Sequence, residues 1–260
     1  MSLTRRALFR RASITAAGAI ASPTILHWPA NAAEFAYKCG TALPDGHPLC
    51  IRGREAAAKI KEESGGRLDI TFYTNSVLGQ DTAMISQTIA GALEMYCLPI
   101  DLLAPKNEAC GIFGVGFAFA GYDHVWEAMD GELGKHLRGI AEQIGFHCIE
   151  KCPDHGFRQI IMKSKPNYSF GNTYWQKLPP NLQQLSEKHF NAAALTERED
   201  WQKMTKEEVQ NLTGRGMAFN TPDVKPFQDM LKKGGFFGEM KKKSGDQAWA
   251  LLEKYVGPLA

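Results

Sequence analysis

Three extended runs alternate with two helical patterns between residues 35 and 98, and this order constrains the fold most strongly. Residues 68–72 alternate apolar and polar side chains, as a strand with one buried face does. Residues 93–98 are apolar with little alternation, which is typical of a central strand covered on both faces. Helical spacing occupies residues 47–63 and 81–91. A strand–helix–strand–helix–strand order with short connections predicts a parallel sheet in an α/β fold.

The carboxyl ends of these strands are the predicted place for a ligand, because open parallel sheets bind ligands beyond those ends. The ends fall at residues 41–46, 75–81 and 98–101. Asp81 also stands where the second helix begins, and an aspartate there is a common N-terminal cap. The residues leave the two roles of Asp81 open.

A strand-prone run over residues 154–162 carries one arginine, Arg158, directly after a glycine and a phenylalanine. Its guanidinium either reaches solvent along its own apolar stem, as in a surface salt bridge, or points into a cleft that holds a carboxylate. The planar fork of donors matches a carboxylate well. Arg158 is therefore a candidate anchor for an organic acid.

The N-terminus has the features of an export signal. Residues 4–10 resemble the twin-arginine motif, a mildly apolar run over residues 12–26 follows, and Ala30 and Ala32 are small residues of the kind that a signal peptidase reads. The alternative is a membrane anchor, but this run is too short to cross about 30 Å of hydrocarbon as a helix. We expect residues 1–32 to be a twin-arginine-type signal peptide and the mature chain to be periplasmic.

The charge balance does not favour a polyanionic partner. The formal net charge is +2, and residues 1–32 contribute four arginines and no acid, so the remaining residues carry −2. Neither nucleic acid nor an anionic membrane surface is expected as a partner. Lys241, Lys242 and Lys243 form an isolated basic run without interleaved aromatic residues.

An oxidising compartment permits disulfides, but the six cysteines have irregular spacings and a chain of this size does not need them. His147, Cys148, Cys152 and His155 could be drawn as a metal site, but neighbours on one extended segment do not easily close a tetrahedron. A Cys148–Cys152 bridge is an alternative that an extended backbone disfavours. No nucleophile–histidine–acid arrangement supports catalysis, and no cofactor is expected.

The rest of the chain predicts further elements. Residues 111–119 are glycine-rich but lack the spacing of a nucleotide-binding loop. The predicted elements that follow are one long helix over residues 122–144 closed by Gly145, strands at 146–151 and 158–163, a helix from Pro179–Pro180 to residues 214–216, a short strand at 217–219, and helices at 223–233 and 247–255.

Residues 34–166 resemble the solute-binding (DctP-type) subunit of tripartite ATP-independent periplasmic (TRAP) transporters. The resemblance rests on short motifs in a fixed order: Gly40-Thr41, Ser64-Gly65-Gly66-Arg67, Asn75-Ser76-Val77-Leu78-Gly79, Gly91-Ala92-Leu93, Gly116-Phe117-Ala118-Phe119, Tyr122-Asp123, Met129-Asp130-Gly131-Glu132-Leu133-Gly134 and Gly156-Phe157-Arg158-Gln159. The stretch from Trp175 to Leu182 and the C-terminal run Ala248-Trp249-Ala250-Leu251-Leu252-Glu253 also fit this family.

The resemblance implies a two-lobed clamp with a type II-like periplasmic-binding-protein fold. Such proteins are not enzymes; they capture a small organic acid and pass it to membrane permease subunits driven by an ion gradient. Arg158 would be one of two arginines that grip the ligand carboxylate. Ala42, Asp81 and Pro99 would line the cleft from the first lobe, and of these only Asp81 has a polar side chain.

The chain departs from the family after residue 166. The family continues with a strand that bears the second arginine, whereas here residues 167–174 run directly into the C-terminal helices, and no arginine lies between Arg158 and Arg198. We therefore expect an internal deletion and a truncated second lobe. The predicted parts are a signal peptide (1–32), an intact first α/β lobe (33–150), a second-lobe remnant with the deletion junction (151–174) and a C-terminal helical segment (175–260).

Two alternative functions remain at this point. The chain is a deletion remnant that binds no ligand, or it is a thiol-active periplasmic protein that uses Cys148 and Cys152.

Overall fold

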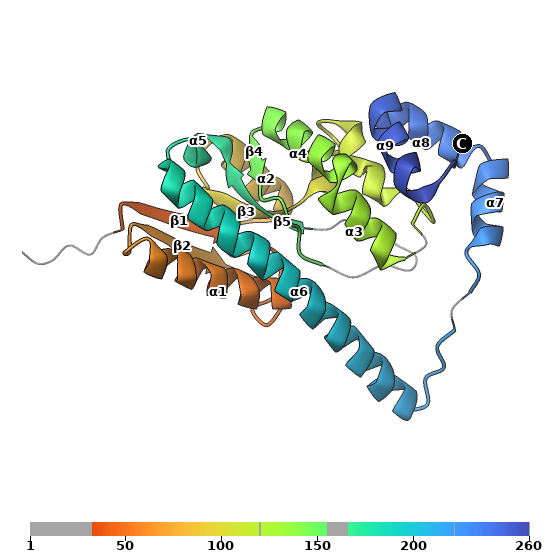
Figure 1. The fold of residues 1–260 in the computed structure, drawn as a ribbon, viewed down its shortest axis with the longest axis horizontal. Helices are drawn as coiled ribbons and strands as arrows, with labels where there is room; N and C mark the ends of the chain where they lie inside the picture. The colour runs from red at the N-terminus through yellow and green to blue at the C-terminus, as the bar shows by residue number, and fades with distance from the viewer. Residues whose placement is uncertain (1–32, 120, 155–165, 221, 260) are drawn as a thin grey trace, which may run out of the picture. The chain divides into compact units, whose positions relative to one another are not determined.

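The computed structural model describes residues 33–119, 121–154, 166–220 and 222–259, and Figure 1 shows their fold. The strands are β1 (Phe35–Gly40), β2 (Leu68–Tyr73), β3 (Met95–Pro99), β4 (Phe146–Cys148) and β5 (Pro166–Gly171). The α-helices are α1 (Pro48–Glu63), α2 (Asp81–Ile89), α3 (Tyr122–Asp130), α4 (Glu132–Ile144), α5 (Asn172–Trp175), α6 (Pro180–Gly214), α7 (Lys225–Lys233), α8 (Phe236–Ser244) and α9 (Asp246–Val256). Two 3₁₀ helices, η2 (Ile100–Leu103) and η3 (Glu108–Gly114), follow β3.

The described strands form one mixed sheet in the order β2-β1-β3-β5-β4. Strand β1 pairs in parallel with both β2 and β3, so the parallel sheet and the α/β fold class predicted from residues 35–98 are confirmed. Strand β5 runs antiparallel to β3 and to β4. Its first residue, Pro166, lies opposite Pro99, the last residue of β3.

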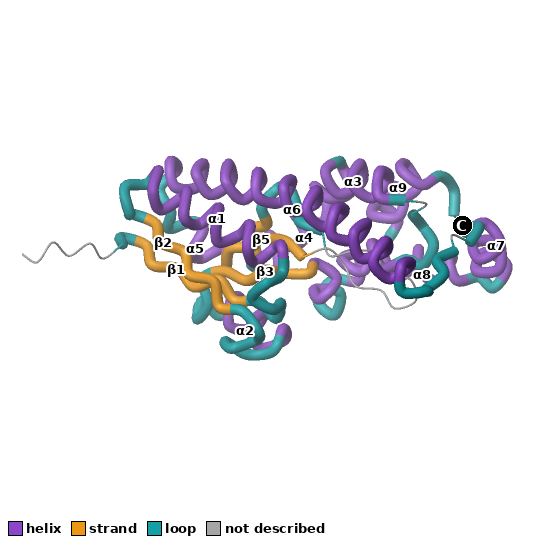
Figure 2. Tube along the Cα trace, turned by 90° about the horizontal axis from the view of Figure 1, so that it is seen from below, coloured by secondary structure: helices purple, strands orange, loops and turns teal. Residues whose placement is uncertain are grey.

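Helices cover both faces of the sheet, as Figure 2 shows for α1 and α6 on one face and α2 on the other. Alternate residues of β3 enter the two cores: Met95 and Cys97 pack with α1 and α6, whereas Tyr96 and Leu98 pack with α2, α4 and α9. This confirms β3 as a central strand with both faces buried. The α6 side of the core contains Leu182, Phe190 and Ala194.

The single helix predicted over residues 122–144 is wrong, because the chain breaks at Gly131 into α3 and α4. The apolar spacing continues in phase through the break, so periodicity alone does not reveal it. Packing does reveal it: a Cβ atom on Gly134 would lie 1.8 Å from the backbone oxygen of Met129. Gly145 closes α4 as predicted, with a φ of 118° in the left-handed region.

Other predicted elements differ from the structure. Strand β4 ends at Cys148 rather than at residue 151, and residues 217–219 lie outside any strand, so that predicted strand is wrong. Met217 and Phe219 are half exposed there, and none of the strands that the structure describes pairs with them. Helix α8 was not predicted, because only its basic last turn stood out in the sequence. The predicted strand at 158–163 lies outside the described residues.

Within the residues that the structure describes, every helix is too short or too polar to cross a membrane.

Candidate functional site

The topology brings three of the four predicted site residues to one edge of the sheet. Because β1, β2 and β3 are parallel, their carboxyl ends face the same way. Ala42 is exposed two residues beyond β1, Asp81 begins α2 beyond β2, and Pro99 is the last residue of β3. Asp81 and Pro99 are both partly buried.

The side chain of Asp81 accepts a hydrogen bond from a residue of β3 and does not cap helix α2. The N-cap of α2 is Gln80, and the Asp81 carboxylate instead accepts a hydrogen bond of 2.7 Å from the Tyr96 hydroxyl. Tyr96 is fully buried in β3, and burial raises its pKa, with the hydrogen bond to Asp81 and its charge adding to the shift. The predicted cap is therefore wrong, although a carboxylate in the first turn still interacts favourably with the helix dipole.

The connection from β1 to α1 is held in place by side chains. Asp45 accepts hydrogen bonds from Thr74, at 2.7 Å, and from Arg54, and these bonds lower the pKa of Asp45. His47 is the N-cap of α1; its Nδ1 accepts the backbone N–H of Leu49, and its ring stacks on Trp201 of α6 with centroids 5.2 Å apart. Burial lowers the pKa of His47. This loop is preorganised beside the strand ends.

Arg158, the fourth predicted site residue, lies outside the described residues. The chain before this gap ends at Asp154, which is fully buried, and the chain after it resumes at Pro166, opposite Pro99. The described backbone therefore re-enters the sheet at the carboxyl end of β3.

A buried arginine on α6 was missed by the sequence analysis. Arg198 donates from both terminal nitrogens to the carboxylate of Asp130, at 2.8 and 2.9 Å, and from Nε to the backbone oxygen of Cys152, at 2.8 Å. Its guanidinium lies 3.8 Å from the ring centroid of Trp126. Asp130 lies within a quoted family motif, but its partner is 68 residues away, so no local pattern could identify the pair.

Burial disfavours the charged forms of Asp130 and Arg198, but the attraction between the two groups outweighs this effect. Burial alone would raise the pKa of Asp130, but the hydrogen bonds and charge of Arg198, with a contribution from Lys151, lower the pKa below its ordinary value. Burial likewise opposes the charge of Arg198, whose pKa is nevertheless raised by Asp130. Both groups are therefore charged at neutral pH.

The thiol-active alternative loses support from the environment of Cys148. This thiol is buried and accepts a hydrogen bond from the Ser169 hydroxyl, and burial raises its pKa to about 12. Nucleophilic thiol chemistry requires the thiolate. A thiol that stays protonated at neutral pH is a poor nucleophile.

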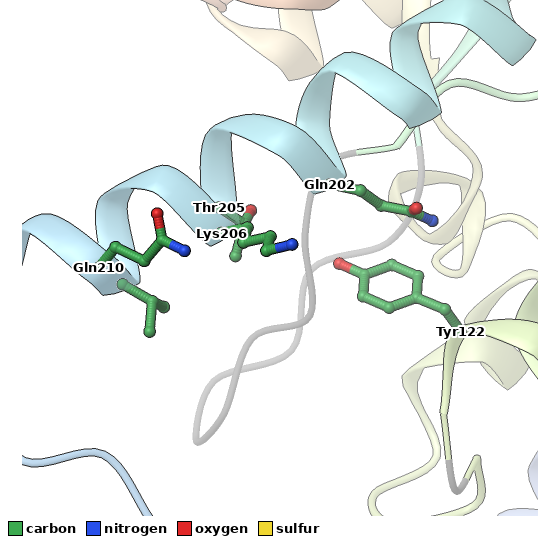
Figure 3. Close-up of a pocket in the computed structure, with 6 residues that line it drawn as sticks. Tyr122, Gln202, Thr205, Lys206 and Gln210 are labelled. Carbon is green, nitrogen blue, oxygen red and sulfur yellow. The ribbon is translucent and has the colours of Figure 1, made fainter.

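A separate groove of about 440 Å³ lies along the C-terminal half of α6, where Tyr122 faces that helix (Figure 3). It is lined by Tyr122, Gln202, Thr205, Lys206, Val209 and Gln210. None of the predicted site residues that the structure describes lines this groove. Among those same described residues, no cluster of three or more His, Cys, Asp or Glu side chains has an arrangement that could hold a metal ion.

Comparison with known families identifies one match. The model of the family "bacterial extracellular solute-binding protein, family 7" (DctP) matches residues 39–172, which is just over half of the chain. A solute-binding protein of Chromohalobacter salexigens is 32% identical over 81 residues, 31% of this chain and 24% of that protein. The 2,3-diketo-L-gulonate-binding periplasmic protein of Escherichia coli is 24% identical over 107 residues, 41% of this chain and 32% of that protein. The matched stretches thus span a third or less of either relative.

Solved structures share the fold at low identity. A TRAP periplasmic solute-binding protein from Pseudomonas putida F1 with bound D-glucuronate matches with a TM-score of 0.71 at 18% identity, over 87% of this chain and 98% of that one. A second from Sulfitobacter, with bound β-D-galacturonate, matches with a TM-score of 0.74 at 12% identity, over 86% of this chain and 100% of that one.

Proposed function

The chain belongs to bacterial extracellular solute-binding protein family 7, and on this basis we propose that it captures a small organic acid and passes it to the membrane permease of a TRAP transporter. The observation that carries the proposal is the family match over residues 39–172. That stretch contains β2 and β3, the carboxyl ends of all three parallel strands and the four proposed site residues: Ala42, Asp81, Pro99 and Arg158.

The proposed ligand class is a small carboxylate. The structural relatives include proteins with bound D-glucuronate, β-D-galacturonate and succinate, and each of these ligands carries a carboxylate. Arg158 is proposed to grip that group, since a guanidinium offers paired donors to it. Ala42, Asp81 and Pro99 are proposed to form the wall beside it. This assignment agrees with the position of Pro166, which follows the segment that carries Arg158 and lies opposite Pro99.

The proposed organisation of the chain implies a low affinity for the ligand. We propose a twin-arginine signal peptide over residues 1–32, a first lobe over 33–150, a remnant of the second lobe over 151–174 and a helical segment over 175–260. An internal deletion after about residue 166 would remove the second arginine of the clamp. Loss of one partner of a doubly held carboxylate costs about 2–5 kcal/mol. We therefore expect the affinity for an acid to lie well below that of a complete clamp.

Titration calorimetry of the purified mature chain tests the proposal. D-glucuronate and succinate are compared with D-glucose, which has no carboxylate. We expect saturable binding of at least one acid and none of the neutral sugar. Arg158→Ala should abolish that binding, and Arg215→Ala, a control at the far end of α6, should preserve it. Absence of saturable binding by folded wild-type protein would contradict the proposal and support the non-binding remnant.

A further inference from the structure

Exposed apolar side chains gather in the C-terminal part of the chain. Eleven large apolar residues are exposed among those that the structure describes, and six of them lie between residues 204 and 230: Met204, Val209, Met217, Phe219, Phe227 and Met230. The most exposed of the eleven is Met230 of α7, at 71%. Single exposed apolar residues need no explanation, whereas a group of them on one segment marks an interaction surface.

Helix α7 carries the densest part of this group. Its partly buried Gln228 donates to the backbone oxygen of Phe117 at 2.7 Å, which fixes the helix against the segment after η3. Phe227 stacks on Phe117 with ring centroids 5.1 Å apart, and both rings remain more than 40% exposed. Met230 follows Phe227 by three residues and therefore lies beside it on the helix surface. We call Phe117, Phe227 and Met230 the α7 patch.

The segment that carries α7 is locally basic. Residues 222–244 contain six lysines and three acidic residues, a net charge of +3. Residues 33–260 carry −2 in total, so the residues outside this segment carry −5. The net charge of the whole chain, which argues against an anionic surface as a partner, hides this segregation.

Two lysines of α7 lie close to the patch without an acidic partner. Lys232 and Lys233 are exposed, and no acidic residue that the structure describes forms an ion pair with either. Lys233 follows Met230 by three residues, so the two side chains are neighbours. Lys225, by contrast, pairs with Asp229. Lysines in a last helical turn also interact favourably with the helix dipole, but the dipole does not account for an exposed methionine beside them.

The chemistry of this surface favours a lipid bilayer over a protein. A second copy bound through the same patch would bring like charges together, because a two-fold interface places the same surface on both sides. A stable protein interface uses about 20–30 residues a side, whereas α7 has nine residues. A short basic helix with apolar side chains on one side instead suits the boundary between water and an anionic lipid layer.

We propose that α7 docks the protein on the surface of an anionic phospholipid bilayer. Phe227 and Met230 enter the headgroup region, and Lys232 and Lys233 contact lipid phosphates, which their long stems let them reach. The contact is shallow and reversible, because even a single acyl chain binds a bilayer only marginally and one short helix buries less apolar surface. The inference does not depend on the solute site, so it is tested separately from the binding of an acid.

Co-sedimentation of the purified mature chain with lipid vesicles tests the proposal. We expect binding to vesicles made of equal parts phosphatidylglycerol and phosphatidylcholine, and much weaker binding to pure phosphatidylcholine. The binding should be lost at about 1 M NaCl, where the Debye length falls to about 3 Å. Equal binding to both kinds of vesicle, or binding to neither, would overturn the proposal.

Matched charge variants separate the patch from the charge of the whole surface. The double variant Lys232→Gln, Lys233→Gln should weaken binding to the anionic vesicles about 25-fold, because each lysine near such a surface contributes about fivefold. Lys59→Gln with Lys135→Gln removes the same charge from exposed positions of α1 and α4 and should bind close to wild type. Equal losses in the two double variants would mean that α7 is not the docking element.

The apolar contribution has its own matched pair. Met230→Ser should weaken vesicle binding about tenfold, the lower end for removing a buried apolar side chain, whereas Val77→Ser, at a residue that is 65% exposed, should not. Both variants should keep the melting temperature of wild type, since neither side chain is in the core. Sedimentation velocity without lipid addresses the second copy: we expect a monomer, and a dimer that Met230→Ser dissociates would overturn the lipid assignment.

Discussion

At the scale of single residues, the structure rests on buried pairs that no local pattern in the sequence reveals. Asp130 and Arg198 are 68 residues apart, and Tyr96 and Asp81 are 15 apart. The family resemblance implied that Asp81 is a site residue, at a strand end where ligands are expected, but its bond to Tyr96 depends on how α2 packs on β3. Side-chain partners of this kind are set by tertiary packing, so they could not be predicted.

The Asp130–Arg198 pair predicts a pH dependence of stability. The pKa of Asp130 is lowered from its ordinary value of 3.8, so its contribution is fully present above that pH and is lost as the pH falls through the folded value. Besides Arg198, Lys151 faces the carboxylate, and Glu150 contacts Lys151. Asp130→Asn should lower the free energy of unfolding at pH 7 by about 3 kcal/mol, as removal of one partner of a buried pair does.

Urea denaturation at pH 7 and at pH 3 measures this effect. The difference between wild type and Asp130→Asn should shrink at pH 3, because below 3.8 the carboxyl is mostly protonated in the unfolded chain, and folding must then release that proton. A difference that stays constant between the two pH values would show that Asp130 does not contribute through its charge.

Variants at Tyr96 and Asp81 distinguish two roles of Asp81: a hydrogen bond that stabilises the fold and a place in the proposed solute site. Tyr96→Phe should cost about 1.5 kcal/mol, the lower end for a hydrogen bond to a charged group, because Asp81 is only partly buried and can bind water instead. If Asp81 also lines the solute site, Asp81→Asn should change the affinity for D-glucuronate whereas Tyr96→Phe should not. Denaturation measures the stability of both variants, and calorimetry measures their affinity for D-glucuronate. If Asp81→Asn binds D-glucuronate as tightly as wild type does, Asp81 is not part of the site.

At the scale of elements, the sequence predicted what depends on amphipathic spacing and missed what depends on contacts. The strands and helices between residues 35 and 99 follow from their apolar patterns, and β3 is buried on both faces as its unbroken apolar run indicates. The break at Gly131 and the coil at 217–219 were missed because their patterns continue a helix and a strand. The close backbone contact between Met129 and Gly134 accompanies the break, and no described strand pairs with residues 217–219.

Two glycines of α4 form a matched test of the packing between α3 and α4. A Cβ atom on Gly134 would meet the backbone oxygen of Met129 at 1.8 Å, whereas nothing lies within 4 Å of one on Gly139. Gly134→Ala should therefore destabilise the protein by about 3 kcal/mol, the upper end for overpacking. Gly139→Ala should stabilise it by up to about 1 kcal/mol, because alanine favours a helix interior. Thermal denaturation of both variants decides, and similar effects would refute the close contact.

Residues of helix α6 are predicted to contribute very different amounts to the free energy of unfolding. Phe190 is fully buried between α6 and the sheet, whereas Leu195 on the same helix is 44% exposed. Phe190→Ala should lower the free energy of unfolding by about 3–5 kcal/mol, and Leu195→Ala by less than about 1 kcal/mol. Guanidinium denaturation measures both. Comparable losses would mean that α6 does not pack on the sheet through this face.

At the scale of the whole molecule, the family and the α/β fold follow from the sequence, whereas the path of the chain around the site does not. Residues 39–172 match the family, and the described strands form a single sheet whose parallel part carries the proposed ligand edge. The proposed deletion would remove the second arginine of the two-lobed clamp, and under the proposed function the ligand carboxylate would then have one anchor, Arg158. Before the segment that bears Arg158, side chains of α6 hydrogen-bond the described backbone at Lys151, Cys152 and Asp154.

A crystal structure of the protein grown with D-glucuronate tests the central claim most directly. The account predicts the ligand carboxylate within hydrogen-bonding distance of the Arg158 guanidinium, at the strand ends that carry Ala42, Asp81 and Pro99. A ligand bound elsewhere, such as in the groove beside Tyr122, with Arg158 turned toward bulk solvent, would contradict it.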